Sequence, residues 1–181
     1  GSSVGTPEMI RKASKIVVGA SKKACLERSR KAYPEHGRRN GVVVVVSAFQ
    51  GITDQLLKSA KLAASGNEKY KNEVEGIKNR HIEAVNRLVK SKKLKLESLN
   101  YVEKLINELS DVLERTRGKK EALPKESDLI ASFGERLSAF IVSAHISDTF
   151  SKKSYFADAR EFVKTDDNFV NAAVDFDSTN R

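Results

Sequence analysis

Residues 42–51, VVVVVSAFQG, determine which fold class the sequence predicts. Val42 to Val46 are five β-branched residues without polar alternation, a pattern typical of a strand buried on both faces. Such strands belong to parallel sheets that helices cover. After Gly51 the apolar residues recur at helical spacing, and Gly66 follows the last of them, which predicts a helix. The strand, turn and helix together predict an α/β fold.

Helical patterns flank this unit on both sides. Thr6 can cap a helix that has Pro7 in its first turn and that extends as far as about Tyr33. Residues 68–117 carry two apolar stripes at helical spacing and predict a helical hairpin that turns near residues 90–95. Such a hairpin can be an interaction arm, but helices that cover a sheet are the favoured reading. His81 lies on an apolar stripe, which favours a structural histidine.

A helix over residues 126–148 is apolar or small on nearly every side, which predicts burial all round. Residues 155–157, Tyr-Phe-Ala, predict a second short strand. Two strands are fewer than a stable sheet needs, so the sequence is typical of a fragment.

Composition limits the class of protein. The chain has 181 residues, of which 39% are hydrophobic and 31% charged. Its longest apolar run, residues 42–46, is far shorter than the roughly 20 residues of a membrane span, and the first residues do not resemble a signal peptide. One cysteine, Cys25, and three histidines without ligand-like spacing predict no protein-bound metal. We expect a soluble, cytoplasmic protein.

The net charge of +9 raises the question of polyanion binding. The basic residues are mixed with glutamates along helical segments and are not interleaved with aromatic residues, as a base-stacking surface would require. This distribution favours a solvated surface, without a nucleic-acid or membrane partner.

Two places could carry chemistry. Residues 47–53 lead from the predicted strand into a helix and offer the hydroxyls of Ser47 and Thr53 with the backbone amides of a helix start, which suit an anion. A plain capping turn explains the same residues. Glu135 lies among small residues of the predicted buried helix, where its charge needs a positive partner. That partner is either a Lys or Arg of the same domain or a cationic ligand group.

Four segments resemble, in their sequences and in their order along the chain, motifs of the aspartate kinases of the amino-acid kinase family. Residues 1–5, GSSVG, are similar to the end of the family's opening motif, although a Gly-Ser start is also typical of a cloning scar. Residues 43–57, VVVVSAFQGITDQLL, resemble the second motif. Residues 132–138, SFGERLS, resemble the third and most specific one. Residues 156–160, FADAR, with Thr165 and Asp166 resemble the segment that follows.

The resemblance implies a three-layer αβα sheet, incomplete in this fragment, with the hairpin as an insertion. It implies that Thr53 contacts the carboxylate end of a substrate aspartate, that Glu135 contacts its ammonium group, and that Ser47 lines the same pocket. Gly1 and Ser2 would approach the phosphate oxygens of ATP.

The reaction implied is ATP-dependent phosphorylation of the L-aspartate side chain to 4-phospho-L-aspartate, with Mg²⁺ bound to the phosphates. This is a phosphotransfer to a carboxyl group and the first step of lysine, threonine and methionine biosynthesis. The resemblance also implies that the parent enzyme is a homo-oligomer. The lysine of the opening motif would lie before Gly1, and the later nucleotide-binding segments have no counterpart, so we expect this chain to be inactive alone. Asp54 stands where the family favours Asn.

Two alternatives remain. Another kinase of the superfamily could act on a different carboxylate or on a carbamate, which residues 132–138 disfavour. A noncatalytic interaction module could use residues 68–117 as an arm and the basic surface as a polyanion site.

Overall fold

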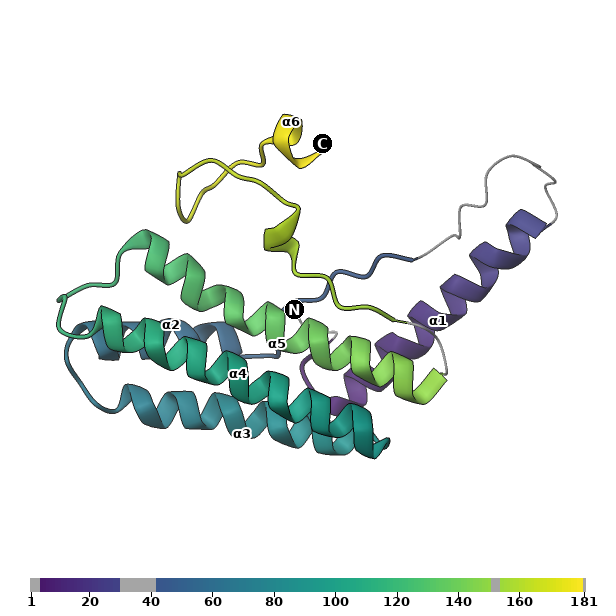
Figure 1. Ribbon diagram of the computed structural model, residues 1–181, viewed down its shortest axis with the longest axis horizontal. Coiled ribbons are helices and arrows are strands. Elements are labelled where there is room, and N and C mark those ends of the chain that lie inside the picture. The colour runs from purple at the N-terminus through teal and green to yellow at the C-terminus, as the bar shows by residue number, and fades with distance from the viewer. Residues whose placement is uncertain (1–3, 30–41, 151–153, 181) are drawn as a thin grey trace.

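The protein is a bundle of helices with an irregular C-terminal segment (Figure 1). The computed structural model describes residues 4–29, 42–150 and 154–180, and residues 22–29 by their backbone only. The helices of these residues are α1 Pro7–Ser29, α2 Ile52–Ala64, α3 Tyr70–Leu88, α4 Lys92–Thr116, α5 Pro124–Phe150, the short 3-10 helix η2 Ala159–Glu161, and α6 Phe176–Thr179. Helices α2 to α5 pack against one another, and α1 lies against α3 and α5.

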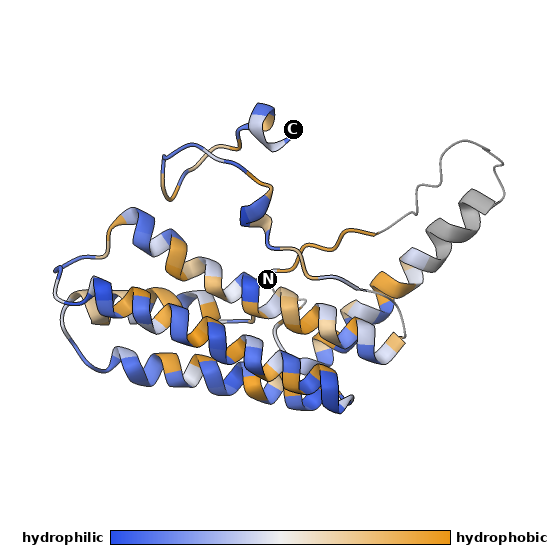
Figure 2. Ribbon diagram, in the orientation of Figure 1, coloured by the Kyte–Doolittle hydropathy of each residue, from blue (hydrophilic) through white to orange (hydrophobic). Residues whose placement is uncertain are grey.

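The predicted α/β sheet is wrong. Within the described ranges there is no strand, only an isolated antiparallel bridge between Thr165 and Val174. Residues 42–46 run as an apolar coil toward α2, visible in orange in Figure 2, and Val43 and Val45 are 90% and 92% exposed. A β-branched run becomes a strand only when its backbone groups pair with a neighbouring strand, and the described residues, with 155–157 among them, provide none. A three-layer αβα arrangement is therefore absent from this part of the chain.

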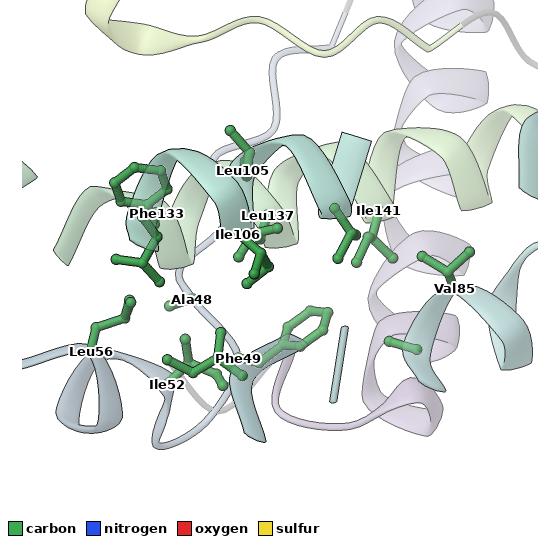
Figure 3. Close-up of a cluster of buried hydrophobic side chains, with 14 of the residues drawn as sticks. Ala48, Phe49, Ile52, Leu56, Val85, Leu105, Ile106, Phe133, Leu137 and Ile141 are labelled. Carbon is green, nitrogen blue, oxygen red and sulfur yellow. The ribbon is translucent and has the colours of Figure 1, made fainter. Parts of the chain in front are cut away.

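The core lies between α2, α3, α4 and α5. Figure 3 shows how the turn before α2 contributes Ala48 and Phe49 to the same cluster as the helices. The helical members that the figure labels are Ile52, Leu56, Val85, Leu105, Ile106, Phe133, Leu137 and Ile141. These side chains recur at helical spacing on their elements, and burying each large one is worth about 1.5–3 kcal/mol. The helical periodicity predicted from the sequence is thus what builds the fold.

Helix α5, which was predicted over residues 126–148, is shielded from solvent along most of its length. It packs against α1, α2, α3 and α4, and most of its residues are buried or half-buried. By length and composition α5 could cross a membrane, but half of its most apolar window is buried inside the protein, as in the core helix of a globular domain. Glu135 is an exception to the predicted burial, because it is exposed.

The predicted helical hairpin corresponds to α3 and α4, joined by residues 89–91. Both helices pack on α2 and α5, so the pair is part of the bundle and does not project as an arm. His81 is buried at 0% exposure, and its ring stacks on Phe49 at 4.8 Å between centroids, in agreement with a structural histidine.

The hairpin turn is fastened to the end of α5 by Asp148. Its carboxylate accepts hydrogen bonds from the backbone N–H groups of Lys90 (2.6 Å) and Ser91 (3.1 Å). We expect Asp148→Ala to lower the free energy of unfolding by about 1 kcal/mol, because two amides at the start of α4 lose their acceptor. Urea unfolding measures this, with Asp111→Ala on the exposed side of α4 as the matched control. Equal effects of the two substitutions would contradict the role of Asp148.

Candidate functional site

The turn before α2 presents the start of a helix without a side-chain cap. Gly51, the N-cap residue, has φ 76°, a left-handed conformation that favours glycine, and no side chain of the described residues hydrogen-bonds at this cap. The amide of Ile52 is bonded to the carbonyl of Phe49 at 2.9 Å. Thr53 follows in the first helical turn and is partly exposed. Uncapped amides with a neighbouring hydroxyl at the positive end of a helix are suited to a carboxylate or a phosphate.

Helix α5 meets this turn directly. The carboxylate of Glu135 accepts a hydrogen bond from the Ala48 N–H at 3.3 Å, and the hydroxyl of Ser138 donates to the Ser47 carbonyl at 2.8 Å. Next to Glu135, the backbone of Gly134 lies against the side chain of Ala48. Residues from two distant motifs are therefore neighbours.

Thr53 is the second residue of α2. It follows Ile52, whose side chain lies near the α-carbon of Gly134. Ser47 and Glu135, two of the three residues to which the resemblance assigns substrate contacts, thus lie at the contact between α5 and the turn, and the third, Thr53, follows in the first turn of α2. Ser47 and Glu135 are exposed, and so is Asp54, which places a further negative charge in the first turn of α2.

Glu135 differs from its predicted surroundings. Its small and apolar neighbours on α5 pack toward the turn and α2, while its carboxylate emerges at the edge of the contact and remains in water. Solvation removes the cost of burial that the sequence suggested. In the part of the chain that the structure describes, no Lys or Arg forms an ion pair with Glu135, so the carboxylate remains accessible to a cationic group.

The N-terminal segment approaches the same turn. Gly5 is buried against Gln50, and a β-carbon at Gly5 would lie 3.0 Å from the Gln50 side-chain oxygen. Residues 4 and 5 are therefore beside the turn that precedes α2. Gly1 and Ser2, which the sequence relates to phosphate binding, lie outside the described residues.

A charged network lies on another side of α5. The Arg136 guanidinium contacts Glu108 of α4 at 3.0 Å and Asp158 at 3.3 Å, while Arg160 bonds both oxygens of Asp158 at 2.9 and 2.7 Å. Hydrogen bonding from Arg160 is the largest cause that lowers the pKa of Asp158, and the charge of Arg136 adds to it. Arg136, Asp158 and Arg160 lie within the motifs that carry the resemblance, but no role was predicted for them. Arg136 lies in the motif of residues 132–138 and Asp158 in that of residues 156–160. Their opposite charges were the sequence feature from which an ion pair between the two motifs could have been predicted.

Other parts of the described surface do not gather the motif residues. A groove of about 410 Å³ between α3 and α4 is lined by Tyr70, Glu114 and eight other residues, none of them from the motifs. Within the described ranges, no group of three or more His, Cys, Asp or Glu side chains is placed to hold a metal ion.

Comparison with known proteins relates the chain to aspartokinases. No protein-family model matches it. The aspartokinase of Saccharomyces cerevisiae is 28% identical over 145 residues, which are 77% of this chain and 27% of that protein. Two solved structures of E. coli aspartokinase III, one in complex with lysine and aspartate (T-state) and one with aspartate and ADP (R-state), match with TM-scores of 0.75 and 0.74 at 21% and 20% identity. Each covers 99% of this chain and 34% of the solved chain, so the described protein spans about a third of those structures and shares their fold there. The chain therefore resembles aspartokinases over most of its length.

Proposed function

We propose that this chain is the N-terminal portion of the catalytic domain of an aspartate kinase and forms its aspartate-binding part. The whole enzyme would transfer the γ-phosphoryl group of ATP to the side-chain carboxylate of L-aspartate, the first step toward lysine, threonine and methionine. The observation that carries this proposal is the 3.3 Å contact between the Glu135 carboxylate and the Ala48 N–H. It joins the second motif to the third, most specific one beside the start of α2, and the resemblance to aspartokinases supports the same reading.

The polarity of this region matches that of the proposed substrate. The uncapped first turn of α2 and the Thr53 hydroxyl would receive a carboxylate, and Ser47 would line the pocket. The exposed Glu135 carboxylate would receive the ammonium group in a charge-assisted hydrogen bond. A zwitterionic amino acid would thus meet a positive and a negative pole. The noncatalytic alternative loses its main support because α3 and α4 are packed into the bundle.

The reaction needs little acid–base chemistry from the protein. A carboxylate with a solution pKa of about 3.9 is already ionised at neutral pH and needs no general base. Catalysis would rest on positioning and on neutralising the charge of the transferred phosphoryl group. ATP with its Mg²⁺ would enter as the second substrate, next to Gly1 and Ser2. We place the enzyme in the cytoplasm as a homo-oligomer. The relatives are about three to four times as long as the matched region, and we expect this chain to bind aspartate without phosphorylating it.

Glu135→Gln is expected to weaken L-aspartate binding at least about tenfold, because an amide cannot neutralise the ammonium group. Isothermal titration calorimetry of L-aspartate measures the change. Glu97→Gln, at an exposed position of α4, is the matched control and should bind as the unaltered chain does. Unchanged affinity in a folded Glu135→Gln variant would refute the assignment of Glu135 to the substrate.

A further inference from the structure

Arg136 occupies a partly buried network directly beside Glu135. Its side chain is 10% exposed, and that of Asp158 is 11% exposed. The guanidinium also lies over the ring of Phe133, 4.8 Å from its centroid. One arginine of α5 therefore contacts α4, the segment after α5, and its own helix.

The network pairs side chains of opposite charge. Two guanidiniums, of Arg136 and Arg160, face two carboxylates, of Glu108 and Asp158. Lys104 also approaches Glu108, at 3.9 Å. If Arg136 lost its charge, α5 would have no ion pair in this network. Glu108 would keep only Lys104 as a partner in the network, and Asp158 only Arg160. Removing one member of a partly buried network costs more than removing an exposed pair.

The segment that carries Asp158 is attached to the bundle at its start by Ser154, which hydrogen-bonds to Ser143 and Ser147 of α5. Residues 154–161 contain no fully buried residue. Phe156 contributes edge-on contacts to Tyr101 and Phe140, at 5.6 and 5.7 Å between centroids. The Asp158 carboxylate adds the ion pair with Arg136. Arg136 is therefore one of the main attachments of this segment to the bundle.

The position of Arg136 on α5 also matters for Glu135. Successive side chains of a helix point about 100° apart. Gly134 faces Ala48, Glu135 comes next, and Arg136 faces α4 and Asp158. A rotation of α5 that moved Glu135 away from Ala48 would have to break the contacts on both sides.

We infer that Arg136 is a positioning residue for the proposed aspartate site, and this inference rests on the proposed function. By anchoring α5 to α4 and to Asp158, it fixes the direction in which Glu135 presents its carboxylate. It does not itself touch the substrate. Its contribution to affinity is indirect, through the orientation of α5 and the placement of residues 154–161.

The test compares Arg136→Met, which keeps the apolar stem, with Arg136→Lys, which keeps the charge. L-Aspartate affinity is measured by calorimetry at a temperature where circular dichroism shows each variant folded. We expect Arg136→Met to bind about tenfold more weakly, equivalent to about 1.4 kcal/mol, and Arg136→Lys to recover part of that loss. Amide hydrogen exchange in residues 154–161 should accelerate in Arg136→Met. Arg117→Met, at the C-cap of α4, is the control and should change neither readout.

A folded Arg136→Met variant with the affinity of the unaltered chain would overturn the inference and leave the proposed function intact. An unaltered chain that binds no L-aspartate would contradict the proposed function itself, and this inference with it. Should Arg136→Met fail to fold, Asp158→Asn removes the charge on the other side of the same ion pair. Weaker L-aspartate binding by this variant would support the inference, and unchanged binding would overturn it.

Discussion

Gly134→Ala is expected to lower the free energy of unfolding by about 2 kcal/mol, as overpacking of a well-packed core does. The direction is opposite to that of an ordinary glycine in a helix, where alanine stabilises by about 0.5–1 kcal/mol. The reversal follows from the closeness of α5 to the turn that leads into α2.

The added methyl group has no room at this position. A β-carbon on Gly134 would lie 2.7 Å from the β-carbon of Ala48, 3.3 Å from a methyl of Leu56 and 3.4 Å from one of Ile52. All three neighbours are buried. The β-carbon of Ala48 is fixed to its backbone and cannot rotate aside, so either the turn or α5 has to move. The same displacement would pull Ala48 away from Glu135.

Gly19→Ala is the matched control. Gly19 also lies inside a helix, α1, but a β-carbon there would meet nothing within 4 Å. Urea unfolding of both variants should give changes of opposite sign. If both alanine substitutions stabilised the chain, the result would contradict the close approach of α5 to Ala48.

Acidification from pH 6.5 to 4 is expected to remove about 3 kcal/mol of stability through His81. Burial lowers the pKa of His81 from 6.5 to about 4, and the charge of Arg80 acts in the same direction. The Nδ1–H donates to the Ile77 carbonyl at 2.7 Å, whereas the buried Nε2 has no hydrogen-bond partner among the residues that the structure describes. Protonation would place a charge against the stacked ring of Phe49.

The sign follows from the two pKa values. Because the pKa of the folded state is lowered, the unfolded chain takes up a proton on this imidazole at a higher pH than the folded chain does. Stability from the neutral, buried ring is complete above about pH 6.5 and falls as the pH drops to about 4. His145 has a pKa lowered by burial as well, and its contribution has the same direction.

Urea unfolding of the unaltered chain and of His81→Leu, between pH 7 and 4, isolates this effect. His145 titrates in both proteins, so the difference between them reports His81. The unaltered chain should lose about 3 kcal/mol more than the variant over this range. Identical pH dependence in the two proteins would show that His81 is not held neutral by the fold.

The sequence predicted the helices well because their information is local. Apolar residues at helical spacing mark α2 to α5, Thr6 caps α1 by accepting from the Met9 N–H at 3.3 Å, and Gly66 ends α2 at φ 74°. The strand prediction over residues 42–46 failed because strand formation depends on a partner elsewhere in the chain. Residue type alone shows that a segment favours pairing and cannot show that it is paired.

Ser47, Thr53 and Glu135 were named from the resemblance and remain predictions as site residues, although Ser47 and Glu135 do lie at the contact between α5 and the turn before α2. The prediction that Glu135 is buried was wrong, because the spacing of small and apolar residues along a helix does not show which side chains at the edge of a contact reach solvent. The ion pair of Arg136 with Asp158 joins residues far apart in sequence, a contact that no local pattern records.

Heteronuclear NMR titration of the unaltered chain with L-aspartate tests the proposed aspartate site most directly, with L-malate as the analogue that lacks the ammonium group. The account predicts saturable shifts of the amides of Ala48, Thr53 and Glu135 with L-aspartate, and much weaker binding of L-malate. No saturable shift with L-aspartate, or equal binding of both compounds, would contradict the assignment of this helix contact to aspartate.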